Sequence, residues 1–403
     1  MGAPATPSAP DGQAAGPAVA AFRDPAPFSI EAQGHALSFH PDGPGRLRAL
    51  LALIDGAQHS MRMAFYIYAA DASGRQVRDA LVAAARRGVA VTVVLDGFGA
   101  TAGEQFFAPL IAAGGCFCCF QPRWNVRYLI RNHQKIAVAD ETRAMLGGFN
   151  VADDYFAPSA DPRGWTDLAF TVEGPVVGRI TGWFDALARW SRNPHARFRA
   201  IRKLVREWAV GPGPVQLLIG GPTTGLSSWA RHVSQDLRQA HRLDMMMAYF
   251  SPPPRLQKHI RTIARTGSAR LVMPALSDNA ATVGAARALY ARLLDAGAQV
   301  WEFEAAKMHT KLIVLDDRTY IGSANFDMRS LYLNLEIVLC IRDAALADRM
   351  RALIGEYLPA CTPITPALHH ARRGWWNRLR WRASWFLVSV VDYTVSRRLN
   401  LGL

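Results

Sequence analysis

Two copies of one short motif carry the residues best suited to chemistry. The first copy reads RNHQKIAVADETRAMLGGFN around His133, and the second reads KMHTKLIVLDDRTYIGSAN around His309. Both contain His-x-Lys-x4-Asp, formed by His133, Lys135 and Asp140 and, 176 residues later, by His309, Lys311 and Asp316. One such octapeptide could arise by chance. Two copies at a constant offset predict a paired catalytic site.

The residue types indicate phosphate chemistry. Lysine supplies a compact positive charge for phosphate, and a neutral histidine can act as nucleophile or proton carrier near neutral pH. A Gly-rich turn and an asparagine follow each motif, Asn150 in the first copy and Asn325 in the second. The two lysines and the two asparagines would hold the non-bridging oxygens and stabilise developing charge.

Two histidines on one phosphate suit a two-step transfer. One histidine attacks phosphorus while the other protonates the leaving alcohol, and the second then deprotonates the incoming nucleophile. We expect no metal and no other cofactor in this site, because lysine opposes a cation and the sequence lacks His or Cys pairs at zinc-ligand spacing. The alternative is that each His-x-Lys is an ordinary strand edge, which the duplication disfavours.

The surrounding pattern predicts alternating strands and helices in each half. Apolar β-type runs alternate with amphipathic runs that end near a glycine. The expected strands are 61–69, 89–97, 136–140, 243–250, 268–275, 298–303 and 312–316, and the expected helices are 75–88, 104–115, 255–267 and 285–297. The sequence therefore predicts two α/β units, and each contains one motif strand.

Length and composition agree with two domains. The chain has 403 residues, of which 50% are hydrophobic. Residues 1–27 are rich in Ala, Pro and Gly and are expected to be a disordered leader without a signal peptide. Pro212 and Pro214, with flanking glycines, predict a linker at 206–217. No run reaches the roughly 18 apolar residues of a spanning helix. The five cysteines form no even disulfide framework and favour a reducing compartment.

The C-terminal segment 371–403 is basic and rich in tryptophan. It has seven arginines against one aspartate, a net charge of 7 − 1 = +6, and the whole chain carries +14. Its apolar stretch ASWFLVSVV is too short to cross a bilayer. Interfacial tryptophans beside arginines predict a segment lying in a membrane surface. The expected membrane-binding residues are Trp375, Trp376, Trp381 and Trp385. The alternative is a helix packed on the protein itself.

Taken together, these segments resemble the phospholipase D superfamily, and most closely its bacterial cardiolipin synthase branch. The resemblance extends from Leu47 to Tyr357 and rests on the two motifs, ARRGVAVTVVLDGFGA at 85–100, YFSPPP at 249–254 and RSLYLNLE ending at Glu336. The chain is similar to the short form of this branch, which lacks N-terminal transmembrane helices. The resemblance implies two repeated phospholipase D-like α/β domains with mixed sheets, spanning 28–205 and 218–360, with the active site at the interface between the halves.

The resemblance also implies roles for individual residues. An acidic residue some two dozen positions beyond each histidine orients an imidazole, and Asp167 and Glu336 occupy those positions. Asp140 and Asp316, which close the motifs, are expected to be structural partners. Ser323 joins the two asparagines as an expected phosphate-binding residue. By family habit, His133 is the expected nucleophile.

The implied function is a phosphatidyltransferase that makes cardiolipin from phosphatidylglycerol and a second phospholipid through a phosphatidyl-histidine intermediate. It would act peripherally at the cytoplasmic face of the bacterial inner membrane. The phosphatidyl donor and the oligomeric state stay open. A hydrolytic phospholipase D uses the same residues with water as acceptor. A nucleic-acid phosphodiesterase would suit the basic charge, but the Trp-rich tail argues against nucleic acid as the partner.

Overall fold

Each half of the chain builds one large mixed sheet in the structure, a computed structural model that describes residues 22–121, 130–193, 195–223 and 225–388. The first sheet has the strand order β1-β2-β9-β7-β6-β3-β4-β5, with β1 Phe28–Ala32, β2 His35–His40, β3 Ser60–Phe65, β4 Ala90–Asp96, β5 Cys116–Phe120, β6 Ile136–Ala139, β7 Arg143–Gly147 and β9 Ala169–Glu173. The second sheet has the order β10-β19-β17-β16-β11-β13-β14-β20, with β10 Val215–Gly220, β11 Arg242–Met247, β13 Ser268–Pro274, β14 Gln299–Phe303, β16 Lys311–Leu315, β17 Arg318–Gly322, β19 Glu336–Arg342 and β20 Cys361–Pro363.

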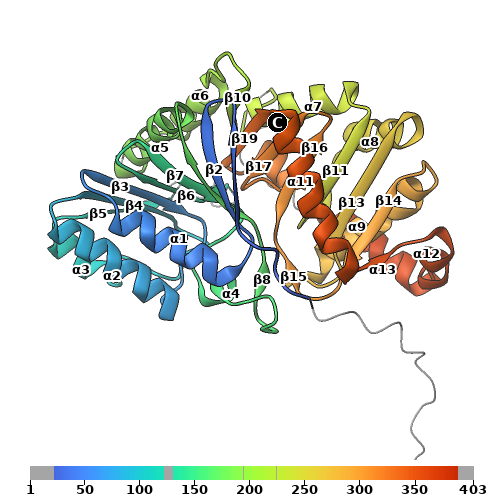
Figure 1. Cartoon of the computed structure of the whole chain (residues 1–403), viewed down its shortest axis with the longest axis horizontal. Helices are drawn as coiled ribbons and strands as arrows, with labels where there is room; N and C mark the ends of the chain where they lie inside the picture. The colour runs from blue at the N-terminus through green and yellow to red at the C-terminus, as the bar shows by residue number, and fades with distance from the viewer. Residues whose placement is uncertain (1–21, 122–129, 194, 224, 389–403) are drawn as a thin grey trace, which may run out of the picture.

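The two sheets repeat the same connectivity. The motif strand is central in both, because β6 lies antiparallel between β7 and β3, and β16 lies antiparallel between β17 and β11. The next two strands outward, β4 and β5 or β13 and β14, run parallel to β3 or β11. Figure 1 shows the two sheets as two lobes that meet at the middle of the molecule. The predicted pair of α/β domains with mixed sheets is confirmed.

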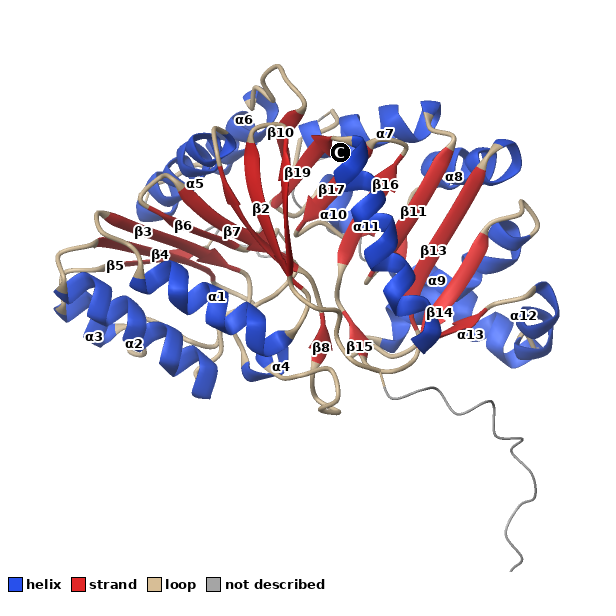
Figure 2. Ribbon diagram, in the orientation of Figure 1, coloured by secondary structure: helices blue, strands red, loops and turns tan. Residues whose placement is uncertain are grey.

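Helices cover the outer faces of the sheets and fill the space between them (Figure 2). In the first half they are α1 Gly43–Asp55, α2 Ala72–Arg86, α3 Ala108–Ala112, α4 Asp153–Phe156, α5 Val176–Arg192 and α6 Phe198–Glu207. In the second half they are α7 Ser228–Gln239, α8 Pro254–Thr266, α9 Ala280–Leu294, α10 Met328–Tyr332, α11 Ala344–Tyr357, the 3₁₀ turn η2 Leu358–Ala360, α12 Pro366–Arg372 and α13 Trp375–Phe386. Four short strands complete the fold: β8 Trp165–Thr166, β12 Phe250–Ser251, β15 Lys307–Met308 and β18 Phe326–Asp327.

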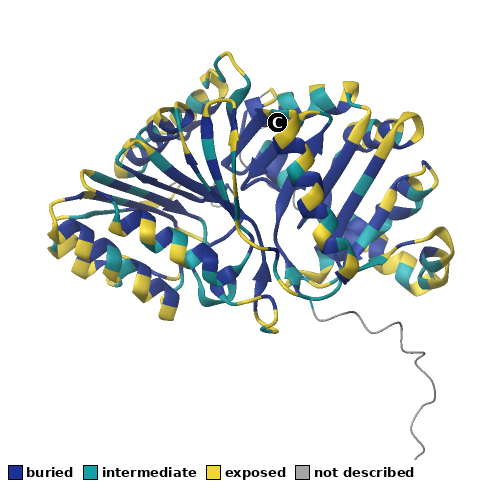
Figure 3. Cartoon of the chain, viewed as in Figure 1, coloured by how far each residue is buried: buried dark blue, intermediate teal, exposed yellow. Residues whose placement is uncertain are grey.

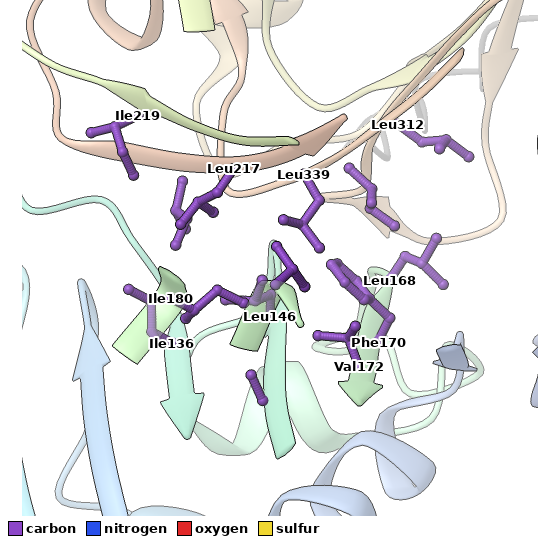
Figure 4. Packing of buried hydrophobic residues seen from close by; sticks show 14 of the residues in the cluster. Ile136, Leu146, Leu168, Phe170, Val172, Ile180, Leu217, Ile219, Leu312 and Leu339 are labelled. Carbon is purple, nitrogen blue, oxygen red and sulfur yellow. The ribbon is translucent and has the colours of Figure 1, made fainter. Parts of the chain in front are cut away.

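The inner faces of the two sheets share one hydrophobic core. Leu146 and Phe170 of the first sheet face Leu217 and Leu339 of the second, and Ile180 of α5 lies beside them (Figure 4). In Figure 3 both sheets are almost wholly buried, while the outer helices expose one side. A core shared in this way holds the two lobes in a fixed relation, because interiors pack at high density.

The predicted strands and helices are present, with shifted ends. Helix α2 begins at Ala72 rather than at 75 because the Asp71 side chain accepts a hydrogen bond from Gly74 N at 2.8 Å and caps the helix. Helix α9 likewise begins at Ala280, where Asn279 caps it. Caps fix helix starts more closely than hydrophobic periodicity does.

Three predicted domain boundaries need correction. The expected disordered leader ended at 27, but Phe22 packs on Phe303 at 5.0 Å between ring centroids, and Ser159 N donates to Asp24 at 3.2 Å; residues 1–21 lie outside the described part of the chain. The expected linker 206–217 contains the start of β10, because Val215 already pairs with β19. The second sheet continues past 360, since β20 pairs with β14.

Candidate active site

The two motif histidines and lysines lie where β6 and β16 begin, at the junction between the lobes. His133 and His309 are 8% and 3% exposed, and both lysines are buried. Lys135 Nζ donates to His133 O at 2.7 Å, and Lys311 Nζ donates to His309 O in the same way. Each lysine therefore stays close to the histidine of its own motif.

Each histidine is paired with a carboxylate from the other half. His133 Nδ1 lies 3.1 Å from Glu336 Oε2, and His309 Nδ1 lies 2.8 Å from Asp167 Oδ2. With Nδ1 engaged, Nε2 is the nitrogen directed away from the carboxylate and suited to chemistry. The sequence identified both acids, and the structure adds that the partners cross between halves.

Backbone pairing between the halves sets up these crossed contacts. Strand β15 pairs in parallel with β8, and His309 N donates to Thr166 O at 2.7 Å. On the other side, His133 N donates to Leu335 O at 3.0 Å, and Leu335 N donates to Arg131 O at 2.9 Å. Figure 1 shows β8 and β15 meeting between the lobes. Each half thus completes the site of the other, and neither half alone holds an oriented histidine.

Aromatic rings lie beside both imidazoles, one at His133 and three at His309. The Tyr66 ring lies 5.0 Å from the His133 ring, whereas His309 lies 5.3 Å from Tyr155, 5.4 Å from Trp165 and 6.2 Å from Tyr249. These rings exclude water from the imidazoles. A dry site strengthens every electrostatic interaction within it.

Burial and neighbouring charges shift the pKa values of the site. Burial, together with the two lysines, lowers the pKa of His309 to about 3 and that of His133 well below its usual value. Burial also lowers the pKa of Lys135 to about 7 and that of Lys311 to about 8. Without a bound anion both histidines are therefore neutral at neutral pH, as a nucleophile requires.

The two carboxyl groups shift in opposite directions. Burial raises the pKa of Glu336 to about 8, although Lys135 opposes this. Burial also acts to raise the pKa of Asp167, but the contact with His309 and the charges of Lys311 and Arg46 outweigh it and lower that pKa. Asp167 is therefore ionised at neutral pH, while Glu336 holds a proton.

The three expected phosphate-binding residues lie beside the motifs, and their side chains differ in the hydrogen bonds that they make. Asn325 is 3% exposed, and its Oδ1 has no hydrogen-bond partner among the described residues. Asn150 Oδ1 accepts from Ile67 N at 3.2 Å, and the Asn150 side chain also hydrogen-bonds the Tyr155 hydroxyl, which leaves it one amide N–H for substrate. Ser323 is different, because its hydroxyl donates to Glu336 Oε2 at 2.5 Å and accepts from Ile337 N at 3.0 Å. The prediction that Ser323 binds phosphate is therefore wrong, and its hydroxyl is instead a hydrogen-bond partner of Glu336.

The two motif aspartates lie at the far ends of the motif strands. Asp140 accepts from the backbone N–H groups of Gln58, His59 and Ser60 at 2.7–2.8 Å, and Asp316 accepts from His241 N and Arg242 N. Both take positive φ, +52° and +48°. They tie adjacent strands together at turns and lie across the length of a strand from the histidines. Their grouping with the catalytic residues is therefore wrong, and their expected structural role matches these contacts.

Sequence reasoning missed a buried arginine that positions the His309 side. Arg46 is fully buried, and its guanidinium donates to four backbone oxygens, those of Pro41, Tyr155, Trp165 and Asp167. It thereby fixes the segment that carries Tyr155, Trp165 and Asp167. No local pattern marks this residue, since an arginine two residues before another arginine reads as surface charge.

The rim of the site carries opposite charges on its two sides. Near His133, the charges of Arg131 and Arg329 act on Tyr66, and the Arg131 guanidinium lies 3.6 Å from the centre of the Phe98 ring. Near His309, Tyr249 OH donates to Asp278 Oδ1 at 3.1 Å. The His133 side thus attracts anions, while the His309 side offers an acceptor for hydroxyl groups.

The four tail tryptophans lie apart from this site and divide into two sets. Trp375 and Trp376 are 75% and 62% exposed on α13. Trp381 is 5% exposed and stacks on His369 at 5.5 Å between ring centroids, and Trp385 packs partly buried against the core of the second lobe. The prediction of a membrane-facing residue is therefore wrong for Trp381, which belongs to the packing alternative. Residues 389–403 of the predicted tail lie outside the described residues.

Comparison with known proteins places this geometry in a family. A family model described as "Cardiolipin synthase, PLD-like domain" matches residues 50–187 and 233–357. Cardiolipin synthase B of Shigella flexneri is 30% identical over 361 residues, which cover 86% of each chain. The cardiolipin synthase of Clostridium perfringens strain 13 is 27% identical over 355 residues, 84% of this chain and 73% of that protein.

Solved structures agree on the fold. Phosphatidylserine synthase from Haemophilus influenzae Rd KW20 superposes with a TM-score of 0.71 at 14% identity, covering 94% of this chain and 97% of that one. Within the described residues, no helix combines the length and apolar character needed to cross a membrane. The duplicated motifs, the matching domain segments and the similarity over most of the chain lead to one conclusion: the chain belongs to the cardiolipin synthase family of phospholipase D-like proteins.

Proposed function

We propose that the protein is a phosphatidyltransferase that makes cardiolipin from phosphatidylglycerol and a second phospholipid. The observation that carries the proposal is the crossed pairing of His133 with Glu336 and of His309 with Asp167, beside two buried lysines. This arrangement supplies a nucleophile, an acid and positive charge for one phosphodiester. The names of the relatives in this family support the choice of lipid substrates.

In the first step one neutral histidine attacks phosphorus through Nε2. The bond to the leaving alcohol breaks, and the other histidine, which takes up a proton when the anionic phosphate binds beside it and Asp167 stabilises the imidazolium, delivers that proton to the alcohol. The product is a phosphatidyl-histidine and a free alcohol, which is glycerol when phosphatidylglycerol is the donor. Arg131 and Arg329 on the His133 rim favour the donor phosphate on that side, so His133 is the proposed nucleophile.

In the second step the hydroxyl of phosphatidylglycerol attacks the same phosphorus. His309, now neutral, accepts the hydroxyl proton, the phosphorus–nitrogen bond breaks, and cardiolipin leaves. Lys135, Lys311, Asn150 and Asn325 hold the non-bridging oxygens through both steps, so the charge that develops there is met by fixed donors. Asp278 at the His309 rim is placed to orient the acceptor hydroxyls.

Lipid analysis tests the proposal directly. The full-length protein is incubated with phosphatidylglycerol vesicles, and the products are separated and identified by mass spectrometry. Cardiolipin and glycerol in equal amounts are the expected result. Phosphatidic acid and glycerol without cardiolipin would show that water is the acceptor and that the protein is a hydrolytic phospholipase D. Unchanged lipid would contradict both activities.

The protein is further proposed to act peripherally, on the cytoplasmic face of the bacterial inner membrane, with the outer side of α13 against the lipid. Trp375, Trp376, Leu379 and Phe386 are all more than half exposed there. Large exposed apolar groups beside arginines are typical of interfacial helices.

Two variants separate this membrane contact from packing. Replacing Trp375 and Trp376 with serine should weaken binding to phosphatidylglycerol vesicles and leave the melting temperature unchanged. Trp381→Ala is the matched comparison, because this buried ring should instead cost about 3–5 kcal/mol of stability. Vesicle sedimentation and thermal unfolding measure the two effects. Full vesicle binding by the double variant would contradict the membrane role of the outer face.

A further inference from the structure

A cavity lies apart from the catalytic histidines and lysines, beneath the C-terminal helices. It has a volume of about 770 Å³ and is bounded by α8, α9, α12 and α13. None of its lining residues belongs to either motif. A volume of this size suits a small molecule or a lipid headgroup, since ligand pockets span roughly 300–1,000 Å³.

The cavity lining is strongly basic. The charged lining residues are Arg287, Arg292, Arg373, Arg378, Arg382 and Asp295, five arginines against one aspartate. Arg287 is neutralised by a two-bond contact with Glu302, at 2.7 and 2.8 Å. The other four arginines have no carboxylate partner within 4.0 Å among the described residues. Guanidinium groups gathered without partners favour an anion, and phosphate above all.

Unused indole donors add a second, independent feature. Trp381 and Trp385 line the cavity, and the Nε1 atom of each is buried without a hydrogen-bond partner in the described part of the chain. Trp381 is itself only 5% exposed. A buried donor without an acceptor is costly, and a phosphate or ester oxygen in the cavity would satisfy it.

Helix α13 is held firmly enough to form a wall. It packs on α9, and at Gly284 an added Cβ would lie 2.7 Å from Ser384 Oγ. His369 of α12 lies between Tyr290 and Trp381, with ring centroids at 6.0 and 5.5 Å. The cavity is thus built by defined packing rather than by a loose surface helix.

The two sides of α13 therefore carry different groups. Trp381 and Trp385 are four residues apart and share the inner face. The exposed Trp375 and Leu379 share the outer face. Arg378 and Arg382 lie along the edge between the two faces and reach the cavity. A molecule that has an anionic headgroup and apolar chains matches both surfaces at once.

We propose that this cavity is a second lipid site that binds the phosphate-bearing headgroup of an anionic phospholipid from the membrane, while its acyl chains stay in the bilayer beside the outer face of α13. The inference rests on the proposed function for its choice of lipid. The bound lipid fixes the protein on anionic membrane and is not consumed, because the cavity lies apart from both histidines.

Removal of single charges tests the site, with a matched control on the same helix. Arg382→Gln and Arg378→Gln remove a cavity arginine, whereas Arg380→Gln removes an exposed arginine of α13 that does not line the cavity. At physiological salt, Arg380→Gln should weaken binding to phosphatidylglycerol vesicles about fivefold at most, the loss expected for one surface charge. Each cavity variant should lose about tenfold or more, because it loses a built contact as well. Equal losses in all three would overturn the proposal.

Photochemical labelling locates the lipid and identifies its source. The full-length protein is irradiated with vesicles that contain a phosphatidylglycerol analogue carrying a diazirine near the headgroup, and labelled peptides are mapped by mass spectrometry. We expect label in 284–295 and 373–386, reduced by unlabelled phosphatidylglycerol and unchanged by about 10 mM inorganic phosphate, which matches neither the chains nor the outer face. Competition by inorganic phosphate would overturn the lipid assignment in favour of a free-anion site. Label confined to the two motif segments would overturn the second site.

These readouts are independent of turnover. A protein that labels in the cavity but makes no cardiolipin would refute the proposed function and leave the lipid site standing. A protein that makes cardiolipin without cavity label would do the reverse. Thermal unfolding of the arginine variants, which change exposed side chains, confirms that each is folded.

Discussion

The two halves of the active site share one backbone design and differ in almost every group around it. His133 has Glu336, the hydroxyl of Ser323 and one tyrosine ring beside it. His309 has Asp167 and several rings. Where Ser323 stands in the second half, the first has Gly148, whose added Cβ would lie 2.4 Å from Asp167 Oδ1.

The difference gives the two carboxyl groups different charges. Arg46 and Lys311 help to keep Asp167 ionised, whereas Glu336 keeps a proton up to about pH 8 because burial dominates its pKa. The duplicated fold therefore gives both histidines a carboxyl partner in the same position, while the groups around each carboxyl decide whether it is ionised. Two equivalent histidines can therefore take unequal parts in one reaction.

Loss of either histidine should have the largest effect. His133→Ala and His309→Ala should each reduce turnover below about a thousandth of wild type, because the transfer needs both an acid and a nucleophile. Cardiolipin formation from phosphatidylglycerol measures this, and His259→Ala on α8 is the matched control. Activity well above a thousandth in either variant would contradict the paired site.

Trapping the covalent intermediate sharpens the same comparison. Rapid quench and peptide mapping should find the phosphorylated peptide that contains His133. A modified peptide containing His309 would reverse the assignment and make the anion-attracting rim the acceptor side.

The two carboxyl groups should respond unequally to amide substitution. Asp167→Asn should cost about 10³–10⁴ in kcat, because an ionised carboxylate that holds the tautomer and stabilises imidazolium is lost. Glu336→Gln should cost about tenfold or less at pH 7, since the group it replaces is largely neutral there. Asp140→Asn, at a turn far from the histidines, serves as control. Equal losses of kcat in the Asp167 and Glu336 variants would mean that both carboxyl groups have the same charge in the working enzyme.

Much of this site could be predicted from the sequence, because its main catalytic groups lie close together within a short motif. His-x-Lys places two functional groups within one strand, so spacing alone reports their proximity. Duplication then identifies the pair. The acids Asp167 and Glu336 could be found by position, but their exchange between halves depends on the β8–β15 pairing, which no local pattern encodes.

The predictions that were wrong or missing concern residues whose contacts depend on tertiary packing. Ser323 follows the same turn as Gly148 and looked like a phosphate ligand, yet the turn directs its hydroxyl to Glu336. Trp381 looked like its exposed neighbours until helical phase placed it against α9. The role of Arg46 could not be predicted because three of its four acceptor residues lie 109–121 residues away in the sequence.

The lysines predict a falling activity at alkaline pH. Lys135 and Lys311 hold phosphate only when protonated, and their pKa values of about 7 and 8 mean that charge is present below pH 7 and lost as the pH rises through 8. kcat/KM should therefore fall about tenfold per pH unit between pH 7 and 8, and about a hundredfold per unit above pH 8, where both lysines lose their protons. kcat should fall less, because a bound phosphate raises both pKa values. A flat kcat/KM from pH 6 to 9 would contradict the lowered pKa values of the two lysines.

The smallest expected effect is that of a chelator. Two ammonium groups stand where a cation would otherwise balance the phosphate, one from each half, so both sides of the site should be complete without a metal. Activity on a detergent-dispersed substrate should be unchanged in excess chelator, which avoids the effect of divalent ions on anionic vesicles. Complete loss of activity, restored by one divalent ion, would show that a metal and not the lysine pair meets the developing charge. Lys135→Met would then separate the two accounts: if the lysines meet that charge, this variant should lose activity about as severely as a histidine variant whether or not divalent ions are present.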